Sequence, residues 1–498
     1  MSKNKKVVIV GAGVSGLSAG IYAQLNGFDS QIVEMHSIAG GICTAWYRKG
    51  YKFDYSIQWL VGSKFGTFYN AYRDTGLLND EVEIINPAFH TKLPNPEVGD
   101  FIIHTDINKW ENYMLEKAPE DACAIKKMCN DMRRCAKLES FDLAPALRTP
   151  FHYIRSLFRS YPTLFTVMRH KNKTCKDYFN KLTIKNEWLR TSLHGIYGES
   201  NFSVIPFLLM LGWYTQRNAG YPAGGSLCIA ERMHRRYTKL GGNILFKKRV
   251  SEVIVENNQA KGVLLDDGTT IECDYVISAT DGYNSVFNLL KGKYQSSQQK
   301  KAYKKWELFS SFVQVSFGIN TDLKTNFPVQ WVVAKGREIG KTTLQQGYRI
   351  LNYNFDRTMA PEGKTCIIIR FDSPWEIWEN ISKEDYKEEK KMIEKAALQL
   401  LEEHYPGASA SVEVYDVATP LTTARYTGAW RGSHEGFLPT PENIVQQLPL
   451  TLPGLSNFYM IGQWLFPGGG IPPSVLSGKW ALQMICKKEK RKFWVRNK

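Results

Sequence analysis

A short apolar run near the N-terminus ends in three spaced glycines, and this feature restricts the fold more than any other in the sequence. Residues 6–10 read Lys-Val-Val-Ile-Val, which predicts a buried parallel strand. Gly11, Gly13 and Gly16 follow directly, and residues 17–23 have the pattern of a helix with small residues on one face. A strand, a GxGxxG turn and a helix in this order predict a dinucleotide-binding unit.

Each of these positions has a physical role in such a unit. Gly11 allows the tight turn, Gly13 lets the backbone approach a pyrophosphate, and Gly16 lets the helix pack close to the strand. The N-terminus of the helix then offers free N–H groups to the phosphates. A second β-run, residues 29–33, ends in Glu34, which we expect to accept hydrogen bonds from the ribose hydroxyls.

A second glycine pair, Gly40 and Gly41, follows the acidic residue. This order resembles the FAD enzymes of the glutathione-reductase superfamily more than simple NAD dehydrogenases. A second GxGxxG after a strand does not occur, so a separate NAD(P)H domain is not expected. The disulfide reductases of that superfamily carry a CxxxxC pair at this point, whereas here Cys43 has Arg48 at the matching distance, which excludes that class.

The composition is that of a folded, basic protein. Of 498 residues 43% are hydrophobic and 22% charged, which excludes a disordered or collagen-like chain. The formal net charge of +16 favours an acidic partner, such as nucleic acid, an anionic membrane surface or an anionic substrate. The run Val7–Val10 is too short for a signal-peptide core, and the longest apolar stretch, residues 205–214, is about half a bilayer span. We therefore expect a cytoplasmic protein without a membrane span.

Five motifs along the chain resemble those of the carotenoid desaturase family, which comprises bacterial phytoene desaturases, carotenoid isomerases and retinol saturases. The resemblance covers almost the whole chain, and the segment 53–59 (FDYSIQW) is nearer to the saturases and isomerases. The motifs are GAGVSGLSAG (11–20), GYKFD (50–54), YPAGGS (221–226), ATPLTTARYTG (418–428) and FPGGGIP (466–472).

The resemblance implies an extended FAD and a set of residues that bind it. Many relatives have Asp or Glu where Gln463 stands, but an amide can still form a hydrogen bond with a hydroxyl. The implied contacts are Gly11, Gly13, Gly16 and Glu34 for the ADP half; Gly40 and Gly41 in the second glycine turn; the backbone at Val250 for adenine; Gly462 and Gln463 for the ribityl–pyrophosphate region; and Gly469, Gly470 and Ile471 for the isoalloxazine.

The fold class that follows is α/β, with a Rossmann-type FAD-binding domain of the glutathione-reductase superfamily, an inserted α/β substrate domain and a helical lobe. The predicted FAD-binding domain comprises residues 1–105, 215–300 and 425–498. The predicted substrate domain comprises residues 300–425 and parts of 105–215, because the FAD motifs flank these segments. Residues 105–210 form the predicted helical, membrane-associated lobe.

Two segments combine basic and aromatic residues. Residues 151–190 hold nine lysines and arginines against two acids, interleaved with apolar side chains, and residues 487–498 hold a basic run with Phe493 and Trp494. Such segments fit peripheral binding to an anionic membrane surface. They also fit a solvated basic face, and they fit nucleic acid less well because no nucleic-acid-binding motif accompanies them.

The activity implied by the resemblance is hydride exchange between FAD and a C–C or C=C bond of a lipophilic polyene, isoprenoid or related lipid. Desaturases, saturases and isomerases share these motifs, so the direction of reaction stays open. A flavin-dependent amine oxidase and a lipid-binding protein that keeps FAD for structure are the alternatives. The sequence contains no Ser-His-Asp, HExxH or paired-carboxylate pattern and predicts no metal site; His434 is the one histidine expected near the substrate.

Overall fold

Segments from both ends and the middle of the chain form a parallel sheet. The computed structural model describes residues 5–136, 140–197 and 200–495. Five parallel strands have the order β21–β13–β1–β2–β9. They are β1 (Lys6–Val10), β2 (Asp29–Val33), β9 (Asn243–Leu245), β13 (Tyr275–Ser278) and β21 (Phe458–Met460). The turn after β1 leads into α1 (Val14–Leu25), so the predicted strand–turn–helix unit is present.

Alternate residues of β1 face two different layers, because side chains alternate across a strand. Val7 and Ile9 pack against helices, and Val8 and Val10 pack against a small antiparallel sheet. The helices are α1, α2 (Gly66–Thr75), α10 (Gly225–Lys239) and α14 (Ile471–Lys488), and the sheet is β10 (Val250–Glu256), β11 (Gln259–Leu265) and β12 (Thr270–Glu272). These three layers are the predicted Rossmann-type domain.

A second sheet of seven strands has the order β20–β14–β19–β18–β15–β6–β7 and is antiparallel except between β15 and β6. One face is covered by the long helix α12 (Lys383–His404). The strands are β6 (Phe89–Leu93), β7 (Phe101–His104), β14 (Phe312–Ile319), β15 (Val329–Val333), β18 (Gly347–Asn352), β19 (Thr365–Asp372) and β20 (Val412–Ala418).

Strands β6 and β7 lie in this second sheet, although they fall inside the segment 1–105 that the sequence assigns to the FAD-binding domain. Strand β7 pairs with β6, and β6 pairs with β15, more than 200 residues later in the chain. Short pairs join the two domains: β3 (Ala45–Arg48) with β4 (Tyr51–Asp54), and β5 (Ile84–Ile85) with β8 (Tyr221–Pro222). The remaining elements of these two domains are a short hairpin and two helices: β16 (Glu338–Ile339) with β17 (Thr342–Thr343), α11 (Ser297–Lys305) and α13 (Pro420–Thr427).

Residues 107–215 form a helical lobe with its own apolar core. Helix α9 is buried along most of its length and α5 is exposed along its length. The helices are α3 (Ile107–Lys117), α4 (Ala122–Cys135), α5 (Pro150–Arg159), α6 (Tyr161–His170), α7 (Cys175–Lys181), α8 (Glu187–Tyr197) and α9 (Val204–Thr215). Within the described ranges, no helix has the length and apolar character needed to cross a bilayer.

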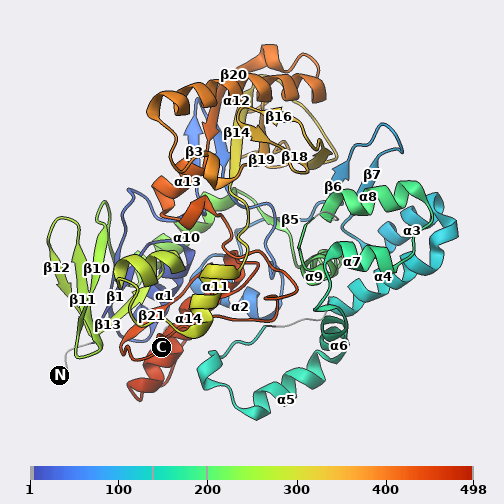
Figure 1. Cartoon of the computed structure of the whole chain (residues 1–498). Helices are drawn as coiled ribbons and strands as arrows, with labels where there is room; N and C mark the ends of the chain where they lie inside the picture. The colour runs from blue at the N-terminus through green and yellow to red at the C-terminus, as the bar shows by residue number, and fades with distance from the viewer. Residues whose placement is uncertain (1–4, 137–139, 198–199, 496–498) are drawn as a thin grey trace.

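Figure 1 shows the three parts around a common centre: the parallel sheet with α1 and α14, the second sheet with α12 above it, and the helical lobe to the right. The predicted fold class, a Rossmann-type domain with an inserted α/β part and a helical lobe, is confirmed. The exact domain limits stay a prediction.

Candidate functional site

The first wall of the site is the turn between β1 and α1. The Gly11 N–H donates to the Val33 carbonyl at 2.8 Å, and Gly11 has a φ of +99°, which favours glycine. A Cβ at Gly16 would lie 1.9 Å from the Gly11 carbonyl oxygen. Helix α1 can therefore pack directly on the turn only because residue 16 has no side chain.

Gly13, the residue before α1, faces open space. The only atom within 4 Å of a Cβ placed there would be the Gly40 carbonyl oxygen, at 4.0 Å. Glycine has no side chain to cap the helix, so the first N–H groups of α1 remain available to a ligand. Gly40 and Gly41 have φ values of +133° and +60°. The Gly40 N–H donates to the Ala12 carbonyl oxygen at 2.9 Å. The structure thus brings both predicted glycine turns together.

Glu34 lies at the end of β2 beside the same turn. Its carboxylate accepts hydrogen bonds from the Ala12 N–H at 2.6 Å and the His36 N–H at 2.8 Å. Each oxygen still has lone pairs for a further donor such as a hydroxyl. Burial raises the pKa of Glu34, and the Ala12 and His36 N–H groups oppose that shift. Val250 lies close to Glu34 in the structure, because the Lys248 N–H, two residues before Val250, donates to the Glu34 carbonyl oxygen at 2.9 Å.

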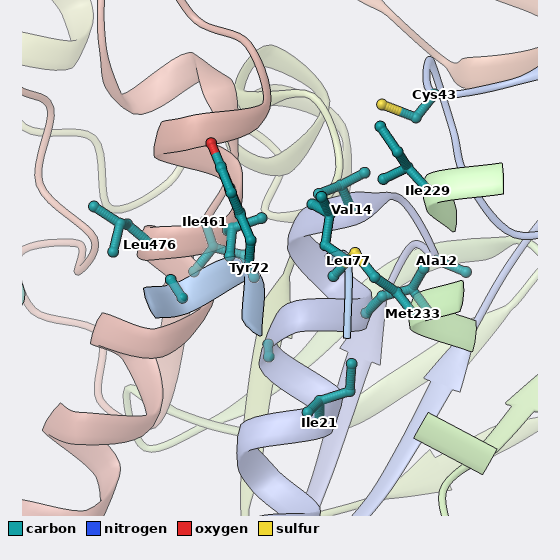
Figure 2. Packing of buried hydrophobic residues seen from close by; sticks show 14 of the residues in the cluster. Ala12, Val14, Ile21, Cys43, Tyr72, Leu77, Ile229, Met233, Ile461 and Leu476 are labelled. Atoms are coloured by element: carbon teal, nitrogen blue, oxygen red, sulfur yellow. The ribbon is translucent and has the colours of Figure 1, made fainter. Parts of the chain in front are cut away.

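The second wall is the start of α14, which crosses α1 at close range. A Cβ at Gly478 would lie 2.8 Å from the Ala19 nitrogen, and the Ser18 hydroxyl donates to the Val475 carbonyl at 2.8 Å. Figure 2 shows part of the buried packing around this crossing, with Val14 and Leu476 among the labelled residues.

The crossing brings the segment 462–471 to the N-terminus of α1. A Cβ on Gly462 would lie 3.5 Å from the Ser15 hydroxyl oxygen, and the Gly462 N–H donates to the Ser477 hydroxyl at 2.9 Å. Gly470 precedes α14 and Ile471 begins it, with Pro472 in the first turn. The two helix N-termini, α1 and α14, therefore belong to one site.

The Gln463 side-chain amide forms hydrogen bonds through both its nitrogen and its oxygen. Its Nε2 donates to the His434 carbonyl at 2.9 Å, and its Oε1 accepts from the Gly470 N–H at 3.2 Å. A carboxylate at this position could accept from Gly470 but could not donate to His434. This gives a physical reason for glutamine at position 463. Gly469 lies directly against the backbone of Glu435, next to His434. A Cβ at residue 469 would lie 2.1 Å from the Glu435 carbonyl oxygen, so only glycine fits there.

His434 lies between this wall and the second sheet. Its ring is 4.8 Å from the Phe312 ring, edge to face, and its Nδ1 is buried without a hydrogen-bond partner in the described structure. Burial, aided by Arg370 and Arg349, lowers the pKa of His434 to about 3, so the ring is neutral at pH 7. Contact of His434 with the substrate stays a prediction.

The sequence reasoning missed the polar residues that hold the motifs to one another. Asp54 of the GYKFD motif accepts hydrogen bonds from the N–H and the hydroxyl of Ser226 in the YPAGGS motif, at 2.6 and 2.8 Å. Ser15 and Ser477 support Gly462 from two helices. The order of the motifs gave the only signal for these contacts, since the partners are far apart in the chain.

The residues present fit an extended dinucleotide. The open space at Gly13, the uncapped start of α1 and the carboxylate of Glu34 lie in the order that pyrophosphate and ribose require. Gly462, Gln463 and Gly470 continue this wall to the second helix N-terminus, whose partial positive charge favours an anionic group. The contact of each predicted residue with the cofactor stays a prediction.

Comparisons with known proteins agree with this geometry. The sequence profile of the family described as flavin containing amine oxidoreductase matches residues 14–483. Prolycopene isomerase of Daucus carota is 23% identical, over 96% of this chain and 79% of its own. Lycopene-forming phytoene desaturase of a Paracoccus species is 22% identical, over 97% of both chains.

Among solved structures, a putrescine oxidase variant has a TM-score of 0.61 with 14% identity and covers 97% of this chain and 99% of its own. At that identity the likeness shows the fold alone. The family match and the two relatives confirm the predicted resemblance, FAD as the cofactor and a flavin-dependent oxidoreductase as the class of enzyme.

Proposed function

The chain belongs to the flavin containing amine oxidoreductase family, and on that premise we propose that it exchanges hydride with a C–C or C=C bond of a lipophilic polyene, isoprenoid or related lipid. The observation that carries the proposal is the match to prolycopene isomerase and phytoene desaturase over nearly the whole chain, including the second sheet and the helical lobe. Both names state a polyene as the molecule acted upon.

The arrangement of the chain suits this chemistry. Bound FAD supplies the hydride exchange. The loop Gly462–Ile471 and the N-terminus of α14 would hold the reacting end of the cofactor, and the second sheet would cover it from the other side. The Trp59 and Tyr214 rings stack at 5.4 Å and pack in the apolar core of the helical lobe, which makes that side of the molecule rich in aromatic side chains.

The test is an anaerobic hydride exchange. Photoreduced enzyme is mixed with candidate polyenes, and the oxidised flavin band and the lipid products are followed together. Reoxidation of the flavin with stoichiometric saturation of a double bond would identify a saturase. Desaturation by oxidised enzyme, or isomerisation without net flavin change, would identify the other two directions.

Two results would overturn the proposal. Flavin that is reoxidised only by oxygen, with peroxide formed from amines, would select the amine-oxidase alternative. Flavin that neither lipids nor amines can cycle would select a lipid-binding protein that keeps FAD for structure.

We also propose that α5 and α6 bind an anionic membrane surface. Phe158 is 81% exposed and Phe151 68% exposed, and Arg155 lies among them on α5. The other large apolar side chains exposed on these helices are Tyr153, Ile154, Leu157, Tyr161, Phe165 and Met168. Helix α5 lies at the edge of the molecule, away from both sheets (Figure 1). Rings and apolar side chains would enter the headgroup layer while the cations meet anionic lipid.

The C-terminal segment, which the sequence predicts to bind the membrane, contacts the FAD-binding domain. The Phe493 ring lies 5.7 Å from the Tyr22 ring of α1, and the Trp494 N–H donates to the Asn26 side-chain oxygen at 2.7 Å. Phe493 thus packs partly on the FAD-binding domain, and both side chains stay partly exposed, so membrane binding by this segment stays a prediction. Residues 496–498 of the predicted segment lie outside the described residues.

Replacing Phe151 and Phe158 together by glutamate is expected to weaken binding to anionic liposomes by at least about tenfold. Each phenylalanine ring that enters the membrane contributes about 2 kcal/mol through burial of its apolar surface, and each glutamate is repelled by the anionic surface. Sedimentation with phosphatidylglycerol vesicles measures the effect, and Val445→Glu, also at an exposed apolar position, is the control. Equal capture of wild type by neutral and anionic vesicles would contradict the electrostatic part of the proposal.

A further inference from the structure

The face of the second sheet opposite α12 carries a row of polar side chains. On adjacent strands Gln314 is opposite Arg370, Arg370 is opposite Arg349, and Arg349 is opposite Trp331. Their sequence neighbours, such as Ile369, belong to the apolar core under α12. Because side chains alternate along a strand, the row lies on the other face.

The two arginines in this row have no counterion at contact distance. Arg370 is only 6% exposed, and neither Arg349 nor Arg370 forms an ion pair with any described residue. The Arg349 guanidinium lies over the Trp331 ring, 5.1 Å from its centre. Like charges directly opposite on neighbouring strands are destabilising, and buried charges are normally paired. The pair therefore lacks an anionic partner at ion-pair distance among the described residues.

Arg370 also has an unused donor. Its Nη2 donates to the Tyr55 carbonyl at 2.7 Å and to the Gln314 side-chain oxygen at 2.6 Å, so the guanidinium is held firmly in place. Its Nε is buried and has no acceptor within the described structure. Buried donors without an acceptor are rare in folded proteins, and such a group indicates an acceptor that comes from a ligand.

The row lies next to the predicted flavin wall. The Arg370 guanidinium is 4.3 Å from the centre of the Phe312 ring, and that ring contacts His434, whose carbonyl binds Gln463. Two carboxyl groups, Asp372 and Glu435, interact with both arginines at longer range, and the buried Asp54 interacts with Arg370 as well.

These two carboxyl groups only partly offset the arginines. Burial raises the pKa of Asp372, and it raises the pKa of Glu435 to about 7, so Glu435 is only partly ionised at neutral pH. The Glu435 side chain is nevertheless 42% accessible to a water-sized molecule. A ligand that binds the arginines would therefore lie close to a carboxyl group that solvent can reach. Negative charge on these carboxyl groups would repel a doubly charged phosphate more strongly than a singly charged carboxylate.

We propose that Arg349 and Arg370 bind a carboxylate of the substrate, which is therefore an apolar chain ending in an acid group and not a pure hydrocarbon. A guanidinium matches a carboxylate in charge and in the geometry of its paired donors. The acid group would fix the position of the chain relative to the flavin. This inference rests on the proposed function, since it names the substrate of that same site.

The experiment compares two probes with one polyene chain and different ends, all-trans-retinoate and all-trans-retinol. Binding to the FAD-loaded full-length protein is measured by the change in tryptophan fluorescence. Retinoate is expected to bind at least about tenfold more tightly, because a hydrogen-bonded charge pair contributes more than a neutral contact. Equal affinity of the two probes would overturn the proposal.

Arg349→Gln is the main variant. Arg349 is only partly buried and its guanidinium lies over the Trp331 ring, so we expect the variant to fold. It is expected to remove the preference for retinoate, whereas Arg357→Gln, at an exposed arginine in the loop after β18, is expected to keep it. Arg370→Lys keeps the charge but loses Nε, and it is expected to reduce the preference. A preference unchanged in Arg349→Gln would refute the assignment, and so would loss of flavin from that variant, since the arginines would then serve the cofactor.

Failure of this inference and failure of the proposed function are separable. Retinoate preference without hydride exchange to any polyene would leave the acid-binding site and remove the proposed function. Hydride exchange with neutral polyenes and no preference for the acid would do the reverse.

Discussion

Gly13→Val is expected to yield a folded protein without flavin. In the structure a Cβ at residue 13 would meet no atom closer than 4.0 Å, so a side chain there begins in open space and does not force α1 away from β1. The space that it fills is the one in which the pyrophosphate would meet the N–H groups of α1. We expect the affinity for FAD to fall at least about 100-fold, which is ~3 kcal/mol or more.

Gly16→Val is the comparison that separates cofactor loss from misfolding. Its Cβ would lie 1.9 Å from the Gly11 carbonyl, so α1 would have to move away from β1. This variant is expected to lose both flavin and stability. The measurements are the flavin absorbance of the purified protein, reconstitution with FAD, and thermal unfolding without the cofactor. Yellow Gly13→Val protein with unchanged affinity would show that the predicted pyrophosphate position is wrong.

The FAD-binding half could be predicted from the sequence because its signals are local. Lys6–Val10, the three glycines and Glu34 lie within 30 residues, and each has a conformational reason that is visible in one stretch of chain. Gly11 and Gly40, for example, have positive φ values in the structure. Helix α14 begins at Ile471, directly after the glycines of the FPGGGIP motif, because Pro472 fits the first turn of a helix.

The second sheet could not be predicted in the same way, because its order depends on pairing between distant segments. Strand β6 pairs with β15 through Lys92 and Gln330, and nothing near either residue indicates the other. The row of Gln314, Arg370 and Arg349 likewise exists only through strand register. Taken singly, Arg349 and Arg370 look like ordinary residues of strands, so sequence reasoning about the site stopped at His434.

Asp54→Ala is expected to destabilise the protein by about 3–5 kcal/mol, because it leaves several buried donors without an acceptor. The Asp54 side chain is fully buried and accepts hydrogen bonds from the N–H groups of Ser56, Ile57 and Ser226 and from the Ser226 hydroxyl, at 2.6–3.2 Å. Asp54→Asn keeps one acceptor oxygen and is expected to lose about half as much. Asp80→Ala, at a side chain 91% exposed, is the control and is expected to change stability by less than ~1 kcal/mol.

The same substitution also tests how the substrate face is held, because Asp54 fixes the end of β4. The Gln314 Nε2 donates to the Asp54 carbonyl at 2.9 Å, and the neighbouring Tyr55 carbonyl accepts from Arg370 at 2.7 Å. If Asp54→Asn folds, Arg370 loses part of its support, and the preference for retinoate should fall while FAD stays bound. Chemical denaturation measures the stability, and the two-probe binding assay measures the preference. Unchanged stability in Asp54→Ala would mean that the buried donors find other acceptors, and that Asp54 does not hold the two motifs together.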